Sequence, residues 1–185
     1  MILFDFVKKY VYRLRGEVDT KSLVKLGLTI GANFKRNEHC IIDQSHCWLI
    51  KIGDNVTLAP NVHILAHDAS MWFETGYTRI AAVNIGNNVF IGAGSIILPG
   101  VNIGDNVVIG AGSVVTKSIE SNCVVAGNPA KKISTYEEFI DKNKELISAS
   151  LCFDETYTLR NKKFSAEQKQ QMKEEIKKSL VGFVE

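Results

Sequence analysis

The sequence lacks the features that mark several large classes of protein. Its 185 residues contain no apolar run close to the ~20 residues that cross a bilayer, and no short apolar stretch with a small-residue cleavage site opens the chain. The formal net charge is only +2 and both signs are mixed throughout, so the composition gives no reason to expect a nucleic-acid partner. We therefore expect a cytoplasmic protein with one compact domain and an appendage.

Cysteine is also scarce, and the four present follow no disulfide framework. The pairs His39-Cys40 and His46-Cys47 raise the alternative of a zinc site, but their spacing fits none of the usual structural-zinc patterns. Ile41 and Ile42 between the pairs are typical of strand core. We expect Cys40, Cys47 and Cys123 to pack as buried thiols and expect no metal cofactor.

What the sequence does contain is a period of six residues between Ile52 and Ile133. An aliphatic residue opens each unit, a glycine often follows it, and a small or branched residue fills the fifth place. The aliphatic positions are Ile52, Leu58, Ile64, Ile85, Ile91, Ile97, Ile103, Ile109 and Val115. Neither a helix nor an ordinary strand repeats at six, so the pattern predicts a β-solenoid whose coils stack about 4.8 Å apart. We expect the glycines to adopt backbone angles that a Cβ would forbid.

The repeat is flanked and interrupted by other patterns. Residues 1–27 have helical spacing of apolar and basic residues, which predicts a helix that caps the open end of the solenoid; contact of this helix with a membrane surface is the alternative. The register breaks after about His67 and resumes by Ile85. The inserted loop, about residues 69–80, holds Met71, Trp72, Phe73 and Tyr77, and we expect it to cover a site or to pack on a neighbouring subunit.

The pattern becomes helical again after Ile133. Ser165 followed by Gln168 indicates a capping box at the start of a second helix in this region. We expect residues 134–185 to form a helical extension that serves packing or assembly.

Three segments on the repeat carry a resemblance to a known family. They are Ile91-Gly-Ala-Gly-Ser, Ile109-Gly-Ala-Gly-Ser-Val-Val-Thr-Lys and Gly127-Asn-Pro-Ala-Lys. Together they resemble the left-handed β-helix acyltransferases. The segment Ile52-Gly-Asp-Asn-Val-Thr-Leu-Ala-Pro-Asn-Val, followed by a histidine-bearing loop, is similar to the maltose and galactoside O-acetyltransferase branch. The resemblance covers about residues 30–133.

The resemblance implies a mainly β fold in which a left-handed parallel β-helix spans residues 28–133. It also implies a homotrimer, with acetyl-coenzyme A as co-substrate in the groove between adjacent solenoids, and one histidine as general base. The chemistry agrees, because a hydroxyl attacks a thioester weakly unless its proton is removed, and an ordinary histidine has a pKa near ~6.5. Backbone amides of a glycine-rich coil could hold the developing oxyanion.

Four histidines compete for the role of base. His67 stands where the register breaks and where the family has its catalytic histidine, although Asp68 follows where the family often has a second histidine or a proline. His63 is the alternative. His39 and His46 lie in the irregular first coil and either line the acceptor pocket or pack.

The resemblance also implies donor-binding positions. Ala93 and Ala111 match places where the family's backbone meets the pantetheine arm. Thr116 and Lys117 match a Thr-Lys pair near the adenine end, and Lys131, with Lys132 beside it, matches a basic residue that would meet coenzyme phosphates. Phe90 stands where galactoside and maltose enzymes often have tryptophan.

Two residues are candidates for binding the acceptor. Asp43 lies near the position of an aspartate that contacts sugar hydroxyls in this branch. Trp72, in the inserted loop, could stack on a sugar face.

The sequence thus predicts an acetyl-CoA-dependent O-acetyltransferase that acts on a hydroxyl of a sugar or glycan precursor. Two alternatives are an N-acetyltransferase acting on an amino sugar and a non-catalytic solenoid that serves as an assembly scaffold. A carbonic-anhydrase-like zinc solenoid is disfavoured, because it needs histidines on separate coils that face one another.

Overall fold

A computed structural model describes residues 17–185 of the chain. The chain divides into two compact units, Met1–Tyr136 and Glu137–Glu185. The first unit contains the six-residue repeat, and the second contains the C-terminal helical pattern.

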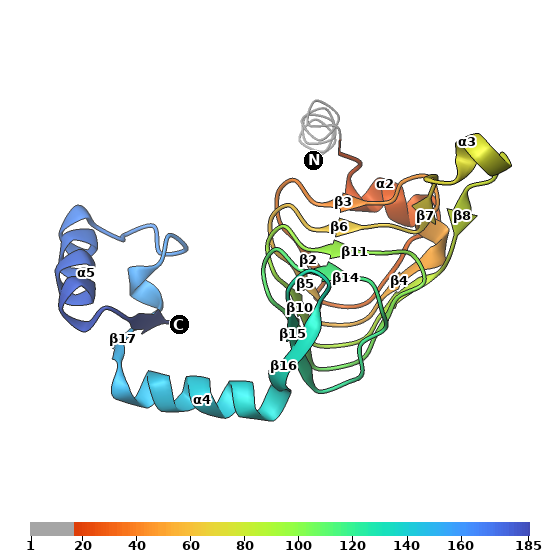
Figure 1. The fold of residues 1–185 in the computed structure, drawn as a ribbon. Coiled ribbons are helices and arrows are strands. Elements are labelled where there is room, and N and C mark those ends of the chain that lie inside the picture. Colours follow the sequence, from red (N-terminus) through yellow and green to blue (C-terminus); the bar gives the residue numbers. More distant parts are fainter. Residues whose placement is uncertain (1–16) are drawn as a thin grey trace. The chain divides into compact units, whose positions relative to one another are not determined.

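The first unit is a stack of coils whose short strands form three parallel sheets (Figure 1). The first sheet contains β1 (Thr29–Ile30), β4 (Ile50–Ile52), β9 (Val83–Ile85) and β12 (Asn102–Ile103), in that order. The second contains β2 (Lys35–Arg36), β5 (Thr57–Leu58), β10 (Val89–Ile91), β13 (Val107–Ile109) and β15 (Cys123–Ala126), followed by the antiparallel β16 (Lys131–Thr135). The third contains β3 (Ile41–Ile42), β6 (His63–Ile64), β11 (Ile96–Ile97) and β14 (Val114–Val115).

The aliphatic residues of the repeat form the core of this unit. Ile52 pairs with Ile85, and in the third sheet Ile64 pairs with Ile97 at the same point of the turn. The side chains of Ile64 and Ile97 are completely buried. Because residues six apart occupy equivalent places on successive faces, each sheet contributes one ladder to the same core. The predicted mainly β solenoid with parallel strands is confirmed.

The glycines of the repeat serve a different purpose from the predicted one. Those that follow the aliphatic residue do not adopt left-handed backbone angles; instead they allow neighbouring coils to approach closely. A Cβ added to Gly53 would lie 2.6 Å from the carbonyl oxygen of Gly86, and one added to Gly92 would lie 2.5 Å from the amide nitrogen of Ala111. Left-handed angles occur two residues later in the same turn, mostly at asparagines such as Asn88, with φ 55°. The expectation about forbidden angles was therefore wrong for these glycines.

Helix α2 (Thr20–Lys25) precedes the first coil. The Asp19 side chain caps it by accepting a hydrogen bond from the Ser22 amide at 3.0 Å. Leu23 is completely buried and belongs to the core cluster, so α2 packs on the coils. The amphipathic basic helix predicted near the N-terminus lies largely within residues 1–16, outside the described part.

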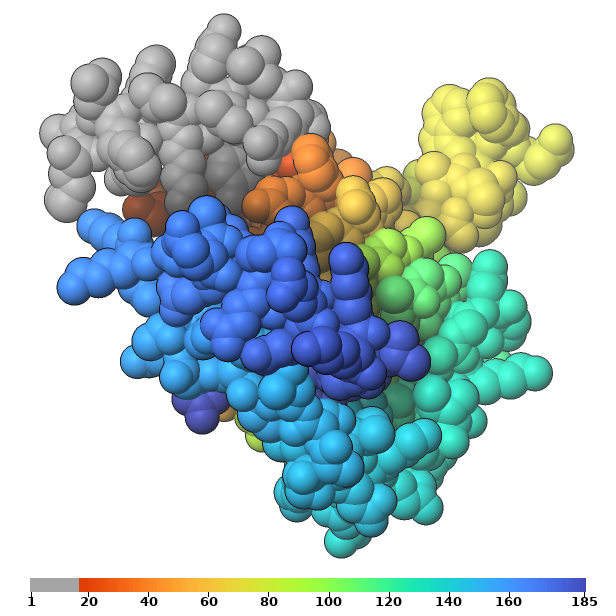
Figure 2. Space-filling view, turned by 90° about the vertical axis from the view of Figure 1, so that its left-hand side faces the viewer, coloured from red at the N-terminus to blue at the C-terminus, as the bar shows by residue number. Residues whose placement is uncertain are grey.

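The predicted insertion is a loop on a short antiparallel pair, β7 (His67–Asp68) and β8 (Arg79–Ile80). Helix α3 (Trp72–Thr75) lies between them and ends at Gly76, which has φ 71°. The loop protrudes from the coils in Figure 1 and Figure 2. A 3-10 turn, η1 (Cys47–Leu49), closes the first coil before β4.

The second unit contains α4 (Tyr136–Ala149), which begins at the boundary, and α5 (Ala166–Ser179). Ser165 and Gln168 form the predicted capping box at the start of α5. Two parallel strands, β17 (Leu151–Phe153) and β18 (Gly182–Val184), and the turn η2 (Glu155–Tyr157) complete it. In residues 17–185, no helix combines the length and the apolar character that crossing a membrane requires.

Candidate active site

The candidate site begins at one corner of the coil, where the strands of the third sheet end. The residues that directly follow these strands are Asp43, Leu65, Leu98 and Thr116. The amide of Asp43 donates to the carbonyl of Ile64 at 2.9 Å, and the amide of Leu65 donates to that of Ile97 at 3.0 Å. The four residues are thus stacked in register, and His67 lies two residues beyond Leu65.

His67 forms a hydrogen-bonded pair with Asp43, although the two residues lie on different coils. The His67 Nδ1 atom is 2.5 Å from Asp43 Oδ2. The Asp43 side chain is 1% exposed, whereas that of His67 is 37% exposed. The carboxylate therefore lies beneath the imidazole and the imidazole faces the surface.

Backbone amides complete the surroundings of the Asp43 carboxylate. Ser45 and His46 donate their amides to Oδ1 at 3.0 and 3.2 Å, and Ala66 donates to Oδ2 at 2.9 Å. Burial acts to raise the pKa of the Asp43 carboxyl, but the hydrogen bonds from Ala66 and His67 outweigh it, so this pKa lies below its ordinary value. Asp43 is consequently ionised at neutral pH.

An ionised carboxylate can only accept hydrogen bonds, and this determines the tautomer of His67. Nδ1 must carry the proton that it shares with Asp43. In the neutral ring Nε2 is then left with its lone pair free, which is the state that a general base needs.

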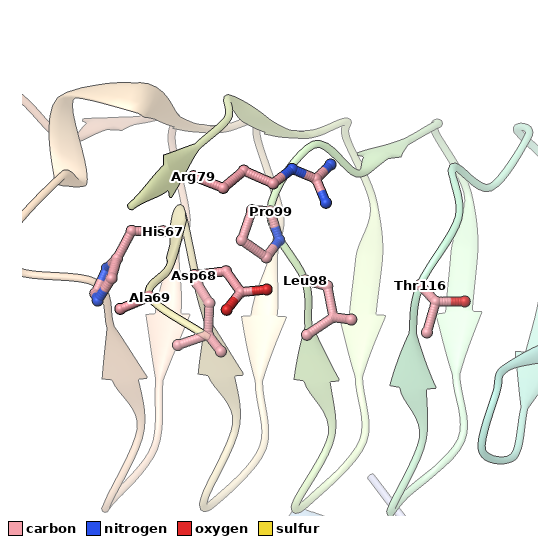
Figure 3. A pocket seen from close by; sticks show the side chains of 8 residues that line it. His67, Asp68, Ala69, Arg79, Leu98, Pro99 and Thr116 are labelled. Carbon is pink, nitrogen blue, oxygen red and sulfur yellow. The ribbon is translucent and has the colours of Figure 1, made fainter. Parts of the chain in front are cut away.

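A cavity of about 400 Å³ opens beside His67 (Figure 3). It is lined by Leu65, His67, Asp68, Ala69, Arg79, Leu98, Pro99 and Thr116. The cavity therefore runs along the stacked corner from the coil of Leu65 to that of Thr116, with the loop strands β7 and β8 beside it. Of the predicted site residues it brings together His67 and Thr116.

The other predicted donor residues lie outside this cavity. Ala93 and Ala111 are exposed at the same corner on successive coils, where the Gly112 amide donates to the Ala93 carbonyl at 2.8 Å. Lys117 is exposed directly after Thr116. Lys131 and Lys132 are exposed on β16, and Phe90, on β10, is 45% exposed.

The two predicted acceptor residues have different surroundings. Asp43 is buried, and its carboxylate is hydrogen-bonded to His67 and to three backbone amides. Its contact with a sugar hydroxyl stays a prediction. Trp72 is 52% exposed in the protruding loop, where it packs edge-on against Phe73 with ring centroids 5.6 Å apart. It does not line the cavity.

The remaining histidines differ from His67 in their contacts. His63 is half-buried on β6 and does not line the cavity. His39 lies 3.5 Å from a carboxylate oxygen of Glu17. Cys40, Cys47 and Cys123 are buried free thiols, as predicted.

Two further residues lie near His67. His46 was predicted either to line the acceptor pocket or to pack, whereas Arg79 was not predicted as a site residue. The His46 ring packs against His67, with centroids 5.3 Å apart. Arg79 lines the cavity from β8. Its guanidinium lies beside Gly100, because a Cβ added to that glycine would be 3.5 Å from a guanidinium nitrogen. No repeat or motif signal marks Arg79, because it lies in the insertion where the register is lost.

Comparison with known proteins identifies the family. The family model for bacterial transferase hexapeptide (six repeats) matches residues 82–117. The Staphylococcus aureus protein CapG is 41% identical over 143 residues, which are 73% of this chain and 81% of CapG. The chain thus belongs to the hexapeptide-repeat acyltransferases, and the predicted resemblance and enzyme class are confirmed.

Two solved structures are similar to this chain. A maltose O-acetyltransferase from Clostridium difficile 630 is 48% identical with a TM-score of 0.53, covering 59% of each chain. A galactoside acetyltransferase in complex with coenzyme A is 40% identical with a TM-score of 0.56, covering 62% of this chain and 58% of the other. This chain therefore spans somewhat more than half the length of these two enzymes.

Proposed function

We propose that the protein is an acetyl-CoA-dependent O-acetyltransferase whose acceptor is a hydroxyl of a sugar or glycan precursor. The observation that carries this proposal is the buried Asp43 carboxylate hydrogen-bonded to Nδ1 of a half-exposed His67, at the edge of a cavity. Support for the donor comes from the similar galactoside acetyltransferase, which was solved with coenzyme A. The sugar acceptor is inferred from the same relative and from the similar maltose enzyme.

In the proposed reaction His67 is the general base. Its Nε2 atom removes the proton of the acceptor hydroxyl while the oxygen attacks the carbonyl carbon of the thioester. Asp43 stabilises the imidazolium that forms. As the tetrahedral intermediate collapses, the carbon–sulfur bond breaks and His67 returns the proton to the coenzyme thiolate, so the enzyme regains its starting state.

The donor is proposed to lie along the stacked corner that ends at Thr116, with Ala93 and Ala111 close to the pantetheine arm. Lys117, Lys131 and Lys132 would meet the phosphates. Several of these residues are remote from the cavity of their own chain, which fits a donor held between adjacent subunits of a homotrimer.

We further propose that the coil is left-handed, as in the family that it resembles. Residues 28–133 would carry the catalytic machinery, with residues 1–27 as a cap and 134–185 as an extension. The cytoplasmic location stays a prediction from the sequence.

A coenzyme-release assay with a panel of neutral sugars tests this proposal, with His67→Ala beside His63→Gln as the matched control. His63 is a half-buried histidine outside the cavity, so its replacement should leave turnover close to that of the parent. His67→Ala should lose on the order of 10²–10⁴-fold in turnover, the usual contribution of a general base, while acetyl-CoA binding persists.

Other outcomes of the same assay would change the role assigned to His67 or the proposed function. Turnover of the His67→Ala protein equal to that of the parent would remove His67 as the base. Acetylation of amino groups in place of hydroxyls would favour the N-acetyltransferase, and failure to bind acetyl-CoA would favour the scaffold.

A further inference from the structure

Three potential metal ligands meet at the base of the candidate active site. One side-chain ligand atom from each of Asp43, His46 and His67 lies within 4.8 Å of the other two. Asp43 is buried and both histidines are half-buried. Asp43 and His46 belong to the first coil and His67 to the next, so the cluster depends on the stacking of the coils.

His46 provides a second, independent observation. Its Nδ1 atom is buried and has no hydrogen-bond partner among the described residues. Buried polar atoms in folded proteins nearly always have a partner, and an exception calls for an explanation such as a bound ion or water. The His46 ring also contacts the rings of Trp48 and His67, with centroids 5.3 Å apart in each pair, and these contacts restrict its position.

The ligand chemistry favours a transition-metal ion. Two imidazoles and one carboxylate are a set that zinc accepts, and three protein ligands leave a fourth position for water. Donors around tetrahedral zinc are about 3.3–3.6 Å apart, given bonds of about 2.0–2.2 Å, so small side-chain rotations would bring these atoms into place. We propose that Asp43, His46 and His67 form a binding site for Zn²⁺.

The proposed site has a consequence for catalysis, and this consequence rests on the proposed function of His67. An ion held between Asp43 and His67 takes the position of the Nδ1 proton. The neutral imidazole then carries its proton on Nε2, and that atom can no longer accept one from a hydroxyl. Zn²⁺ at this site therefore acts as an inhibitor. It replaces the proton that His67 shares with Asp43, and the metal-bound His67 can no longer act as the general base.

The metal alone is a sufficient probe. Zn²⁺ binding is measured by calorimetry and Co²⁺ binding by its visible absorption, with untagged protein of the full chain. Cys152 is an exposed thiol, so every protein carries Cys152→Ser to remove a competing ligand. The test variant is His46→Gln, and the matched control is His39→Gln, an exposed histidine outside the cluster.

We expect His46→Gln to weaken Zn²⁺ affinity by at least about tenfold. Loss of a residue that only hydrogen-bonds to a metal ligand already lowers metal affinity by about that factor, and His46 is proposed as a ligand itself. The absorption of four-coordinate Co²⁺ should vanish with it. His39→Gln should bind like the parent. In the coenzyme-release assay, Zn²⁺ should abolish turnover of the parent protein at the concentration where it fills the site.

Several results would overturn the proposal. They are equal Zn²⁺ affinity of the parent and His46→Gln, equal weakening by His39→Gln, or full turnover with the site filled. An unfolding curve recorded without metal checks that His46→Gln folds, and His46→Asn replaces it if it does not. The binding measurements need no turnover. His46-dependent Co²⁺ absorption in a protein that acetylates nothing would keep the site and remove the proposed function. A protein that acetylates sugars but binds neither Zn²⁺ nor Co²⁺ in the binding measurements would keep the proposed function and remove the site.

Discussion

The most consequential contact at the scale of single residues joins two groups that are 24 positions apart in the sequence. Asp43 and Leu65 occupy the same corner on successive coils, and His67 reaches back from the later coil to the earlier one. The carboxylate is anchored by three backbone amides, so it cannot follow the imidazole if the latter moves. The pair therefore fixes both the orientation and the tautomer of His67.

Replacing Asp43 with asparagine tests this positioning role. An amide at this place can donate to Nδ1, which would force the proton onto Nε2 and leave no lone pair for the acceptor hydroxyl. We expect Asp43→Asn to lower kcat on the order of 10²–10⁴-fold, as loss of the base would. Initial rates and acetyl-CoA affinity are the measurements, and the affinity should hardly change.

Asp54→Asn is the control for this prediction. Asp54 Oδ1 accepts a hydrogen bond from the Ala32 amide at 2.6 Å, and asparagine keeps that acceptor oxygen. Its turnover should therefore match that of the parent. An Asp43→Asn protein with parental kcat but a raised acceptor KM would instead show that Asp43 binds the sugar directly.

Asparagine side chains form a continuous ladder at the scale of the repeated element. At one corner the Nδ2 atom of each asparagine donates to Oδ1 of the next, at distances of 2.9 to 3.0 Å. The ladder runs through Asn33, Asn55, Asn88, Asn106 and Asn122, all with φ between 55° and 61°. Asparagine tolerates this left-handed conformation better than other residues with a Cβ, and here its side chain also links the coils.

Asn88→Ala should therefore destabilise the solenoid by about 1–3 kcal/mol, through strain at positive φ and two lost hydrogen bonds. Asn84→Ala is the matched control: Asn84 donates one such bond, to Asn102 at 2.7 Å, but lies in β9 with ordinary backbone angles. Urea unfolding at fixed protein concentration measures both. Equal losses from the two variants would show that neither the backbone conformation at this corner nor the second hydrogen bond of Asn88 contributes to stability.

The inserted loop is the other element whose role can be tested. Trp72 and Phe73 are neighbours on α3, but Phe73 is 91% exposed whereas Trp72 is 52% exposed. If Trp72 stacks on a sugar, Trp72→Ala should raise the acceptor KM by about tenfold at most, the usual scale of an aromatic contact, and leave the KM for acetyl-CoA unchanged.

Phe73→Ala serves as the control and should keep both constants. Size-exclusion chromatography with light scattering distinguishes the alternative role of the loop. A Trp72→Ala protein that dissociates into smaller species would assign the loop to a contact between subunits.

For the molecule as a whole, the sequence predicted the features that depend on the repeat. The aliphatic ladders follow from one large side chain per six residues, and the position of His67 follows from the point where the register fails. The pairing of His67 with Asp43 could not be predicted, because the coil between residues 30 and 51 keeps the register only loosely. The place of Arg79 in the cavity depends on how the insertion folds back through β7 and β8, which no period encodes.

The division of the chain into two units leads to a prediction at the largest scale. Every residue of the core cluster among the described residues lies between Leu23 and Val125, whereas the second unit buries its own Phe153 against Tyr157, with ring centroids 4.9 Å apart. A chain that ends at Tyr136 retains β16 and the hydrogen bond from the Tyr136 amide to the Asn122 carbonyl at 3.0 Å. Because a unit with its own core can fold by itself, we expect this truncated chain to fold and to keep the turnover of the full chain.

Thermal unfolding, light scattering and the coenzyme-release assay together test this expectation. A smaller assembly with low turnover would assign Glu137–Glu185 to oligomer formation, which the sequence pattern also allows. A folded assembly of parental size with greatly reduced turnover would instead mean that the second unit contributes to the active site. Full activity in the parental assembly would confine acetyl transfer to Met1–Tyr136, the unit that contains Asp43, His67 and Thr116.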